Sequence, residues 1–358
     1  MSNVVHLSAL SKRQTKEDCI AAMLRSFAQY RRFGDDVFWL KENAELLNIL
    51  ECTGAEVSEA ALDAHQGFYD QVEKRMGFFP QYYRFLLSIC LDLEDLGMAG
   101  NKGETLVQWV AREGMADAEL SDLQRFEARR LMMRRGIDPL PLDTGLEDRM
   151  RRFMDRSATF SMPNKKAAYE LTHTVFYLSE YGRRNPELSK SAITSLEFAG
   201  VLAYLDQNAD LLSEICISLR YAGVTPSQIW ENWLQRETEM FTVQSGPNVS
   251  AQDNYHDFFV CNWLMAVSGR KSFTKKTEFD RMAFYRATPC PGPLREMSEC
   301  MFHLDDQRSG DWNEMRRVVE GSLSENAYEI LCEAEQSTDK FGAFFEGFAR
   351  TGMQRVSA

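Results

Sequence analysis

The chain has 358 residues, which is enough for two average domains or for one large helical domain built from stacked repeats. Its composition is that of an ordinary globular protein, with 44% hydrophobic, 26% charged and 11% aromatic residues. The formal net charge of -12 argues against a general binder of nucleic acid or of anionic membranes, because the dominant phosphate attraction would have the wrong sign. We therefore expect the partner to be a small-molecule ligand or another protein.

The cysteines and the apolar segments indicate a protein of the cytoplasm. None of the eight cysteines forms a CxxC pair, and most of them lie in apolar helical contexts. This pattern predicts reduced thiols, without a disulfide framework or a structural zinc knuckle. The first residues lack the apolar stretch and the cleavage site of a signal peptide, and no window approaches 18 uninterrupted apolar residues.

Helical periodicity dominates the chain from about residue 17 onward. Residues 1–15 are expected to be a flexible lead-in. Apolar residues that recur every three to four positions, together with capping residues and glycine stops, then predict a series of helices. These helices are expected over 17–33, 37–52, 58–76, 81–96 and 165–183.

Three glycine-ended helices recur at a nearly constant spacing. Gly97, Gly182 and Gly269 each end an apolar helical stretch, and they lie 85 and 87 residues apart. This spacing indicates three units of about 86 residues, each made of several helices. Such units would stack as an α/α toroid or a curved superhelix in an all-α fold. The alternative is chance, because many helices end in glycine.

Strand signals are few, and one proline-rich segment interrupts the helical pattern. Residues 241–243 are the main β-like stretch. The segment 288–293 either divides a domain or turns a corner, and we favour the corner. We therefore predict a single large helical domain over 16–350, with a sub-boundary near 288–293, and a frayed tail at 351–358.

Two carboxylate–histidine pairs are the best candidates for chemistry. Glu170 precedes His173 by three residues, and Asp253 precedes His256 at the same spacing. Residues at i and i+3 share one face of a helix, so each pair can converge on one ion, as in half of a di-metal carboxylate site. Imidazole and carboxylate ligands together suit Fe, Zn or Mn. The sequence thus predicts a metal site at Glu170, His173, Asp253 and His256.

The same two pairs also fit a structural role or metal-free chemistry. Each histidine can be a partly buried residue that hydrogen-bonds an acid, with Asp253 capping its helix. The pairs can also act in acid/base chemistry without a metal. If His173 and His256 share a site, their helices must pack face to face, as equivalent helices of adjacent repeats do.

The sequence therefore supports two functions from different classes. The first is a metal- or acid/base-dependent enzyme that acts on a small, partly apolar molecule at a carboxylate–histidine site between helices. The second is a non-catalytic helical-repeat protein that binds a partner or serves as a scaffold, with the arginine-rich segment 125–156 as a further contact surface.

Two stretches resemble a known family. DDVFWLKENAELLNILECTG at 35–54 and YELTHTVFYLSEYG at 169–182 resemble an uncharacterised family of all-helical bacterial proteins of about this length, of the kind met in marine alphaproteobacteria. The resemblance covers most of the chain. It implies a helical fold and a bacterial source, and it brings no established activity and no catalytic residue.

Overall fold

The computed structural model describes residues 14–32, 36–287 and 290–352. Within these ranges the secondary structure is helical apart from one two-stranded sheet, which confirms the all-α class. The predicted flexible lead-in falls almost entirely on residues outside the described ranges, as does most of the predicted tail. At the start of the described chain, Thr15 caps the first helix by accepting a hydrogen bond from the Asp18 amide.

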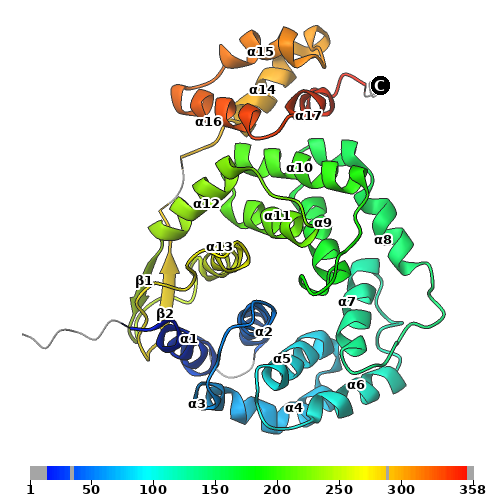
Figure 1. Ribbon diagram of the computed structural model, residues 1–358, viewed down its shortest axis with the longest axis vertical. Coiled ribbons are helices and arrows are strands. Elements are labelled where there is room, and N and C mark those ends of the chain that lie inside the picture. The colour runs from blue at the N-terminus through cyan, green and yellow to red at the C-terminus, as the bar shows by residue number, and fades with distance from the viewer. Residues whose placement is uncertain (1–13, 33–35, 288–289, 353–358) are drawn as a thin grey trace, which may run out of the picture.

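The helices between residues 16 and 267 lie around a ring in two layers (Figure 1). Six inner helices share one property, since each contributes side chains to the same central cavity. They are α2 (Val37–Cys52), α5 (Tyr83–Asp95), α7 (Asp122–Met133), α9 (Lys165–Leu178), α11 (Ala209–Tyr221) and α13 (Tyr255–Val267).

The remaining helices of the ring lie outside this inner set or connect its members. They are α1 (Lys16–Arg25), α3 (Glu59–Leu62), α4 (Gln66–Phe78), α6 (Lys102–Arg112), α8 (Leu146–Met154), α10 (Lys190–Leu205) and α12 (Gln228–Met240). A π-helical turn continues α1 over Ser26–Tyr30, and short 3-10 turns lie at Asp63–His65, Pro80–Tyr82 and Ser157–Ser161.

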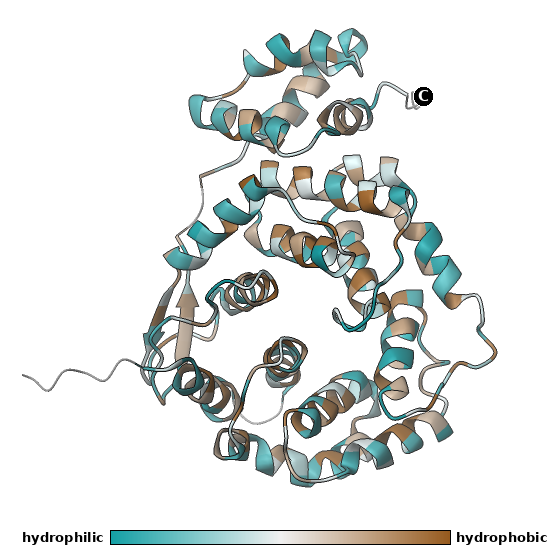
Figure 2. Cartoon of the chain, in the orientation of Figure 1, coloured by the Kyte–Doolittle hydropathy of each residue, from teal (hydrophilic) through white to brown (hydrophobic). Residues whose placement is uncertain are grey.

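The sequence pattern explains which helices lie inside. In the outer helix α6 the buried residues are Gly103, Leu106, Val107 and Val110, which form one stripe at helical spacing. The inner helix α11 is instead buried on all sides from Ala209 to Leu219. In Figure 2 the outer helices α8 and α12 are mostly hydrophilic, whereas α5 and α11 carry more hydrophobic residues. A helix that is apolar all round needs neighbours on every side, and the ring supplies them.

The predicted glycine stops occur at the ends of alternate inner helices. Gly97, Gly182 and Gly269 follow α5, α9 and α13, and their φ angles are 110°, 88° and 71°. These left-handed conformations are the ones that favour glycine at a helix end. Each predicted unit of about 86 residues therefore spans two inner helices, although the sequence repeat itself stays a prediction.

The only sheet within the described residues lies where the first and last parts of the ring meet. Strand β1 (Thr242–Ser245) pairs antiparallel with β2 (Met282–Tyr285), so that Val243 lies opposite Phe284. The Asn254 amide, at the start of α13, donates a hydrogen bond to the Phe284 carbonyl at 2.8 Å. This bond fixes the entry of α13 relative to the sheet.

Four further helices form a group beside the ring. They are α14 (Leu294–Leu304), α15 (Trp312–Glu320), α16 (Glu325–Gln336) and α17 (Phe341–Phe348), and a short 3-10 turn lies at Asp305–Gln307. Figure 1 shows this group stacked on α10, where Tyr204 bonds Glu333 and Lys340 pairs with Glu197. The proline-rich segment lies between β2 and α14, with 288–289 outside the described residues, so it joins the ring to this group. Whether the two parts fold as one domain stays a prediction.

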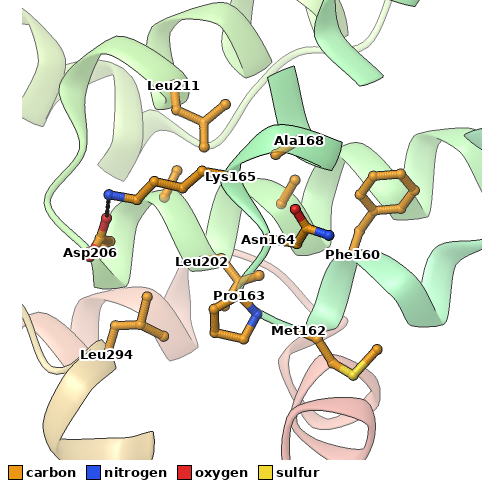
Figure 3. Close-up of a pocket in the computed structure, with 12 residues that line it drawn as sticks. Phe160, Met162, Pro163, Asn164, Lys165, Ala168, Leu202, Asp206, Leu211 and Leu294 are labelled. Atoms are coloured by element: carbon orange, nitrogen blue, oxygen red, sulfur yellow. Dashed lines mark ion pairs between the residues drawn. The ribbon is translucent and has the colours of Figure 1, made fainter. Parts of the chain in front are cut away.

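Figure 3 shows a small pocket at this junction, where Leu294 of α14 approaches the start of α9 and the end of α10. Its volume is only about 40 Å³, and Lys165 and Asp206 form an ion pair at 2.7 Å beside it. A cavity of this size holds little more than one water molecule. Within the described part of the chain, no helix is long and apolar enough to cross a membrane.

Candidate functional site

The centre of the ring contains a cavity of about 210 Å³ that all six inner helices line. Its walls divide into three parts by chemistry. The first part consists of carboxylates and histidines, and the second consists of aromatic rings. The third part consists of a lysine, an arginine and a glutamate from α2, α5 and α7. In that order the principal residues are Glu45, His173, Glu214 and His256; Phe85, Phe176, Tyr177, Tyr181 and Trp263; and Lys41, Arg84 and Glu127.

His256 of α13 is held between two carboxylates. Its Nδ1 is hydrogen-bonded to Glu45 of α2, and its Nε2 lies 3.2 Å from Oδ1 of Asp210 on α11. Burial opposes the charged imidazolium, but the negative charges of Glu45 and Asp210 outweigh burial and raise the pKa of His256 to about 12. The side chain is therefore protonated at neutral pH when no other cation occupies this position.

Asp210 and Glu214 lie one turn apart on α11, so both face the same neighbours. Two hydroxyls from α9 hold them, because Tyr169 donates to Asp210 Oδ2 and Thr172 donates to Glu214 Oε2, each at 2.5 Å. Burial raises the pKa of Glu214 to about 7. Burial also raises the pKa of Asp210. The charge of His256 and the hydrogen bonds that Asp210 accepts from His256 and Tyr169 outweigh burial, so the pKa of Asp210 is lowered. The two acids thus have different protonation states near neutral pH.

Asp210, Glu214 and His256 together can accept a metal ion. Each offers one ligand atom, and the three atoms lie within 4.8 Å of one another. Metal–ligand bonds of 2.0–2.2 Å place neighbouring ligand atoms about 3–3.5 Å apart. The His256–Asp210 separation of 3.2 Å already fits this range, so that mainly Glu214 has to approach. Glu45 and the two α9 hydroxyls would orient the three ligands from behind.

Both histidines predicted from the sequence line this cavity. The Nδ1 of His173 is 2.7 Å from the Tyr169 carbonyl, one turn earlier in α9, and 3.9 Å from Glu214 Oε2. Helix α11 packs against both α9 and α13, so it lies between the helices that carry the two histidines. The two histidines therefore line one cavity, with the helix that carries Asp210 and Glu214 between them.

The two acids predicted beside these histidines lie outside the Asp210–Glu214–His256 cluster. Glu170 is more than a third exposed, and its nearest charged partner is Lys166 at 3.9 Å. The side chain of Asp253 is fully buried, pairs with Nη1 of Arg31 at 2.8 Å, and accepts a hydrogen bond from the Phe284 amide. Its carboxylate thus holds the π-helical turn, the sheet and α13 together, and the N-cap of α13 is Asn254.

Sequence reasoning missed three members of the site, namely Glu45, Asp210 and the ligand role of Glu214. One signal was available for the last two residues. In ADLLSEICISL these are the acids of an otherwise apolar helix, and they stand one turn apart. Acids on a helix that is buried all round need a specific partner, because an isolated buried charge is costly. Glu45 carries no comparable signal, since it is one of three glutamates in α2.

Most arginines of the arginine-rich segment form ion pairs with acids of the same chain. Arg129 pairs with Asp138 at 2.6 Å, Arg134 with Asp92 at 2.7 Å and Arg149 with Asp122 at 2.8 Å. Arg135 and Arg151 also have acidic partners. These contacts join α5, α7 and α8, which favours a structural role for the segment.

The fold and the site define an all-helical ring protein with a carboxylate–histidine cluster in its central cavity. Residues 1–351 match a family described as a domain of unknown function (DUF6902), and the chain belongs to that family. This agrees with the resemblance to an uncharacterised helical family, while the bacterial source stays a prediction. No curated protein and no solved structure matches the chain.

Proposed function

We propose that the protein is an enzyme that acts on a small, partly apolar molecule in the central cavity, with a divalent Fe, Zn or Mn ion held by Asp210, Glu214 and His256. The observation that carries the proposal is the convergence of these three ligand atoms within 4.8 Å, with Glu214 and His256 lining the cavity. One imidazole and two carboxylates form a ligand set that suits these metals. When bound, such an ion polarises a substrate oxygen or activates a water molecule.

The surrounding residues have separate roles in this proposal. Glu45 accepts the Nδ1 proton of His256, which leaves Nε2 directed at Asp210 and at the ion position. Tyr169 and Thr172 fix the carboxylates through their hydroxyls. Since three protein ligands leave coordination positions open, the cavity side of the ion remains accessible to substrate.

A second candidate is acid/base chemistry at the same site without a metal. The specific observation in its favour is Glu214, whose pKa burial raises to about 7. A carboxyl group with this pKa can donate or accept a proton near neutral pH, and it lines the cavity beside His173. His256 fits this chemistry less well, because its pKa of about 12 keeps it protonated.

Metal analysis separates the two candidates. Protein purified without an affinity tag would be assayed for Fe, Zn and Mn, then stripped with a chelator and titrated with each ion. We expect one ion per chain, and we expect His256→Ala and Glu214→Gln to lose it while their circular dichroism stays helical. His303→Ala is the control, because His303 is exposed on α14.

The absence of stoichiometric metal binding in the wild type would overturn the metal site and leave acid/base chemistry at Glu214. Equal metal binding by the wild type and the His256→Ala variant would show that the ion is held elsewhere. The scaffold alternative would stand if the Glu214 and His256 variants changed neither metal binding nor the binding of small molecules.

A further inference from the structure

The aromatic wall of the cavity presents a continuous surface of rings. The centroids of Phe176 and Trp263 lie 4.8 Å apart, while Tyr181 stacks on Phe176 and on Trp263 with centroid distances of 5.8 Å each. Trp263 is fixed from behind, because its Nε1 donates to the Tyr221 hydroxyl at 3.1 Å. Phe85 of α5 adds a half-buried ring to the same cavity. The faces of these rings are covered by one another and by the Arg130 guanidinium, which lies 4.3 Å from the Tyr181 centroid, so the wall offers mainly ring edges to an apolar group.

The volume has room for one ring. A cavity of about 150 Å³ lined by apolar side chains is enough for benzene. The cavity here has about 210 Å³, so it can take one six-membered ring with a short polar substituent.

Two of the three cations at the cavity, Arg84 and His256, have acidic partners. Arg84 is paired with Glu119 and Glu127, and His256 is paired with Glu45 and Asp210. Lys41, by contrast, makes no ion pair or hydrogen bond with any of the described residues, although it lines the cavity. A ligand anion would therefore find in Lys41 a cation that has no partner among the described residues.

Lys41 also stands in the right place to orient a ligand. Lys41, Glu45 and Asn48 follow one another at i, i+4 and i+7 along α2 and all line the cavity. Lys41 is thus one turn from the acid that holds His256, and the Asn48 amide is one turn further along. A ligand whose anionic end pairs with Lys41 would extend along this face of α2 toward the carboxylate–histidine cluster.

We propose that the ligand of the central cavity is a small carboxylate with a single apolar or aromatic ring. Its carboxylate pairs with Lys41, and its ring packs on Phe176, Tyr181 and Trp263. The assignment rests on the proposed function in one respect, since the chemistry would occur at the bond nearest Glu214 and His256. Lys41 is then the residue that selects the anion.

The test compares three probes of nearly equal shape. Phenylacetate, benzyl alcohol and benzylamine would be titrated by calorimetry into full-length protein that has been stripped of metal. We expect phenylacetate to bind at least about tenfold more tightly than benzylamine, because the carboxylate gains Lys41 while the amine is repelled by it. Lys41→Met should remove this preference and leave the affinity for benzyl alcohol unchanged.

Two further variants complete the test. Lys166→Met removes an exposed lysine of α9 outside the cavity and should leave all three affinities unchanged. Phe85→Ala, which keeps every charge, should weaken all three probes. Equal binding of phenylacetate and benzylamine, or an unchanged preference in Lys41→Met, would overturn the inference.

Metal titration is a separate readout. Metal binding without phenylacetate binding would overturn the ligand class and leave the proposed metal site intact. Phenylacetate binding that depends on Lys41 in protein without metal affinity would support the ligand class and restrict the chemistry to Glu214.

Discussion

Glu45 and His256 are 211 residues apart in the sequence and are hydrogen-bonded to each other. Glu45 belongs to α2, the first inner helix, and His256 belongs to α13, the last. The contact therefore joins the two ends of the ring at the wall of the cavity. Because Asp210 lies on the other side of the same imidazole, His256 takes part both in ring closure and in the candidate site.

The first prediction concerns this contact. Glu45→Gln should lower the affinity for the bound metal by about 10–100-fold, because the carboxylate behind a metal-binding histidine raises its basicity and fixes its orientation. The measurement is a calorimetric titration of the stripped variant with the ion found in the wild type. Glu56→Gln removes the same charge from an exposed position and should leave the affinity unchanged. Equal affinities in the wild type and Glu45→Gln would remove Glu45 from the site.

The second prediction separates the structural and metal roles of Asp253. Asp253→Ala should lower the free energy of unfolding by about 3 kcal/mol, because Arg31 is fully buried and would keep only Glu42 as its charged partner. Metal affinity should not change. Urea denaturation and metal titration would be measured on the same preparation. Glu278→Ala breaks an exposed ion pair with Lys276 and should cost less than about 1 kcal/mol. Loss of metal without loss of stability would make Asp253 a ligand after all.

The third prediction is a pH dependence that comes from His65. This histidine is buried, its Nε2 is 2.8 Å from Asn43 Oδ1, and burial lowers its pKa from 6.5 to about 4. Between these values the unfolded chain binds a proton that the folded chain excludes, so stability is present above pH 6.5 and is lost as the pH falls toward 4. From pH 7 to pH 4.5 this loss should be about 2.5 kcal/mol.

His65→Gln should lack this component, so its stability should fall less than that of the wild type over the same pH range. Urea denaturation of both proteins at pH 7 and pH 4.5 gives the comparison. Parallel losses in the two proteins would show that His65 titrates normally.

The fourth prediction tests how the last helix packs on the ring. A Cβ atom at Gly347 would lie 2.1 Å from Ser161 Oγ and 2.9 Å from its Cβ, whereas a Cβ at Gly342 would meet nothing within 4 Å. Gly347→Ala should therefore destabilise the protein by about 1–3 kcal/mol through overpacking. Gly342→Ala, in the same helix, should stabilise it by about 0.5–1 kcal/mol through helix propensity. Thermal unfolding of the two variants measures both effects, and a stabilising Gly347→Ala would contradict the packing of α17.

Much of the local structure follows from the sequence. The predicted helix 37–52 is α2 with the same bounds, and the glycines predicted to end helices adopt left-handed conformations. Both features depend on interactions within a few residues, such as periodic burial, the Asp36 cap and the steric freedom of glycine. The sequence also identified the two histidines that line the cavity, because the chain has only five histidines and these two follow an acid at the same spacing.

The tertiary structure alone decided which acid each histidine meets. The i, i+3 rule places Asp253 near His256 on the helix surface, but Arg31, 222 residues away in the sequence, takes that carboxylate. Glu45 and Asp210 contact His256 instead, and they come from two other helices of the ring. A pattern within one helix specifies which side chains share a face, whereas the neighbour of that face depends on how distant helices pack. Buried charges must be paired across such contacts, so the residues that make up the site depend on how the helices of the ring pack together.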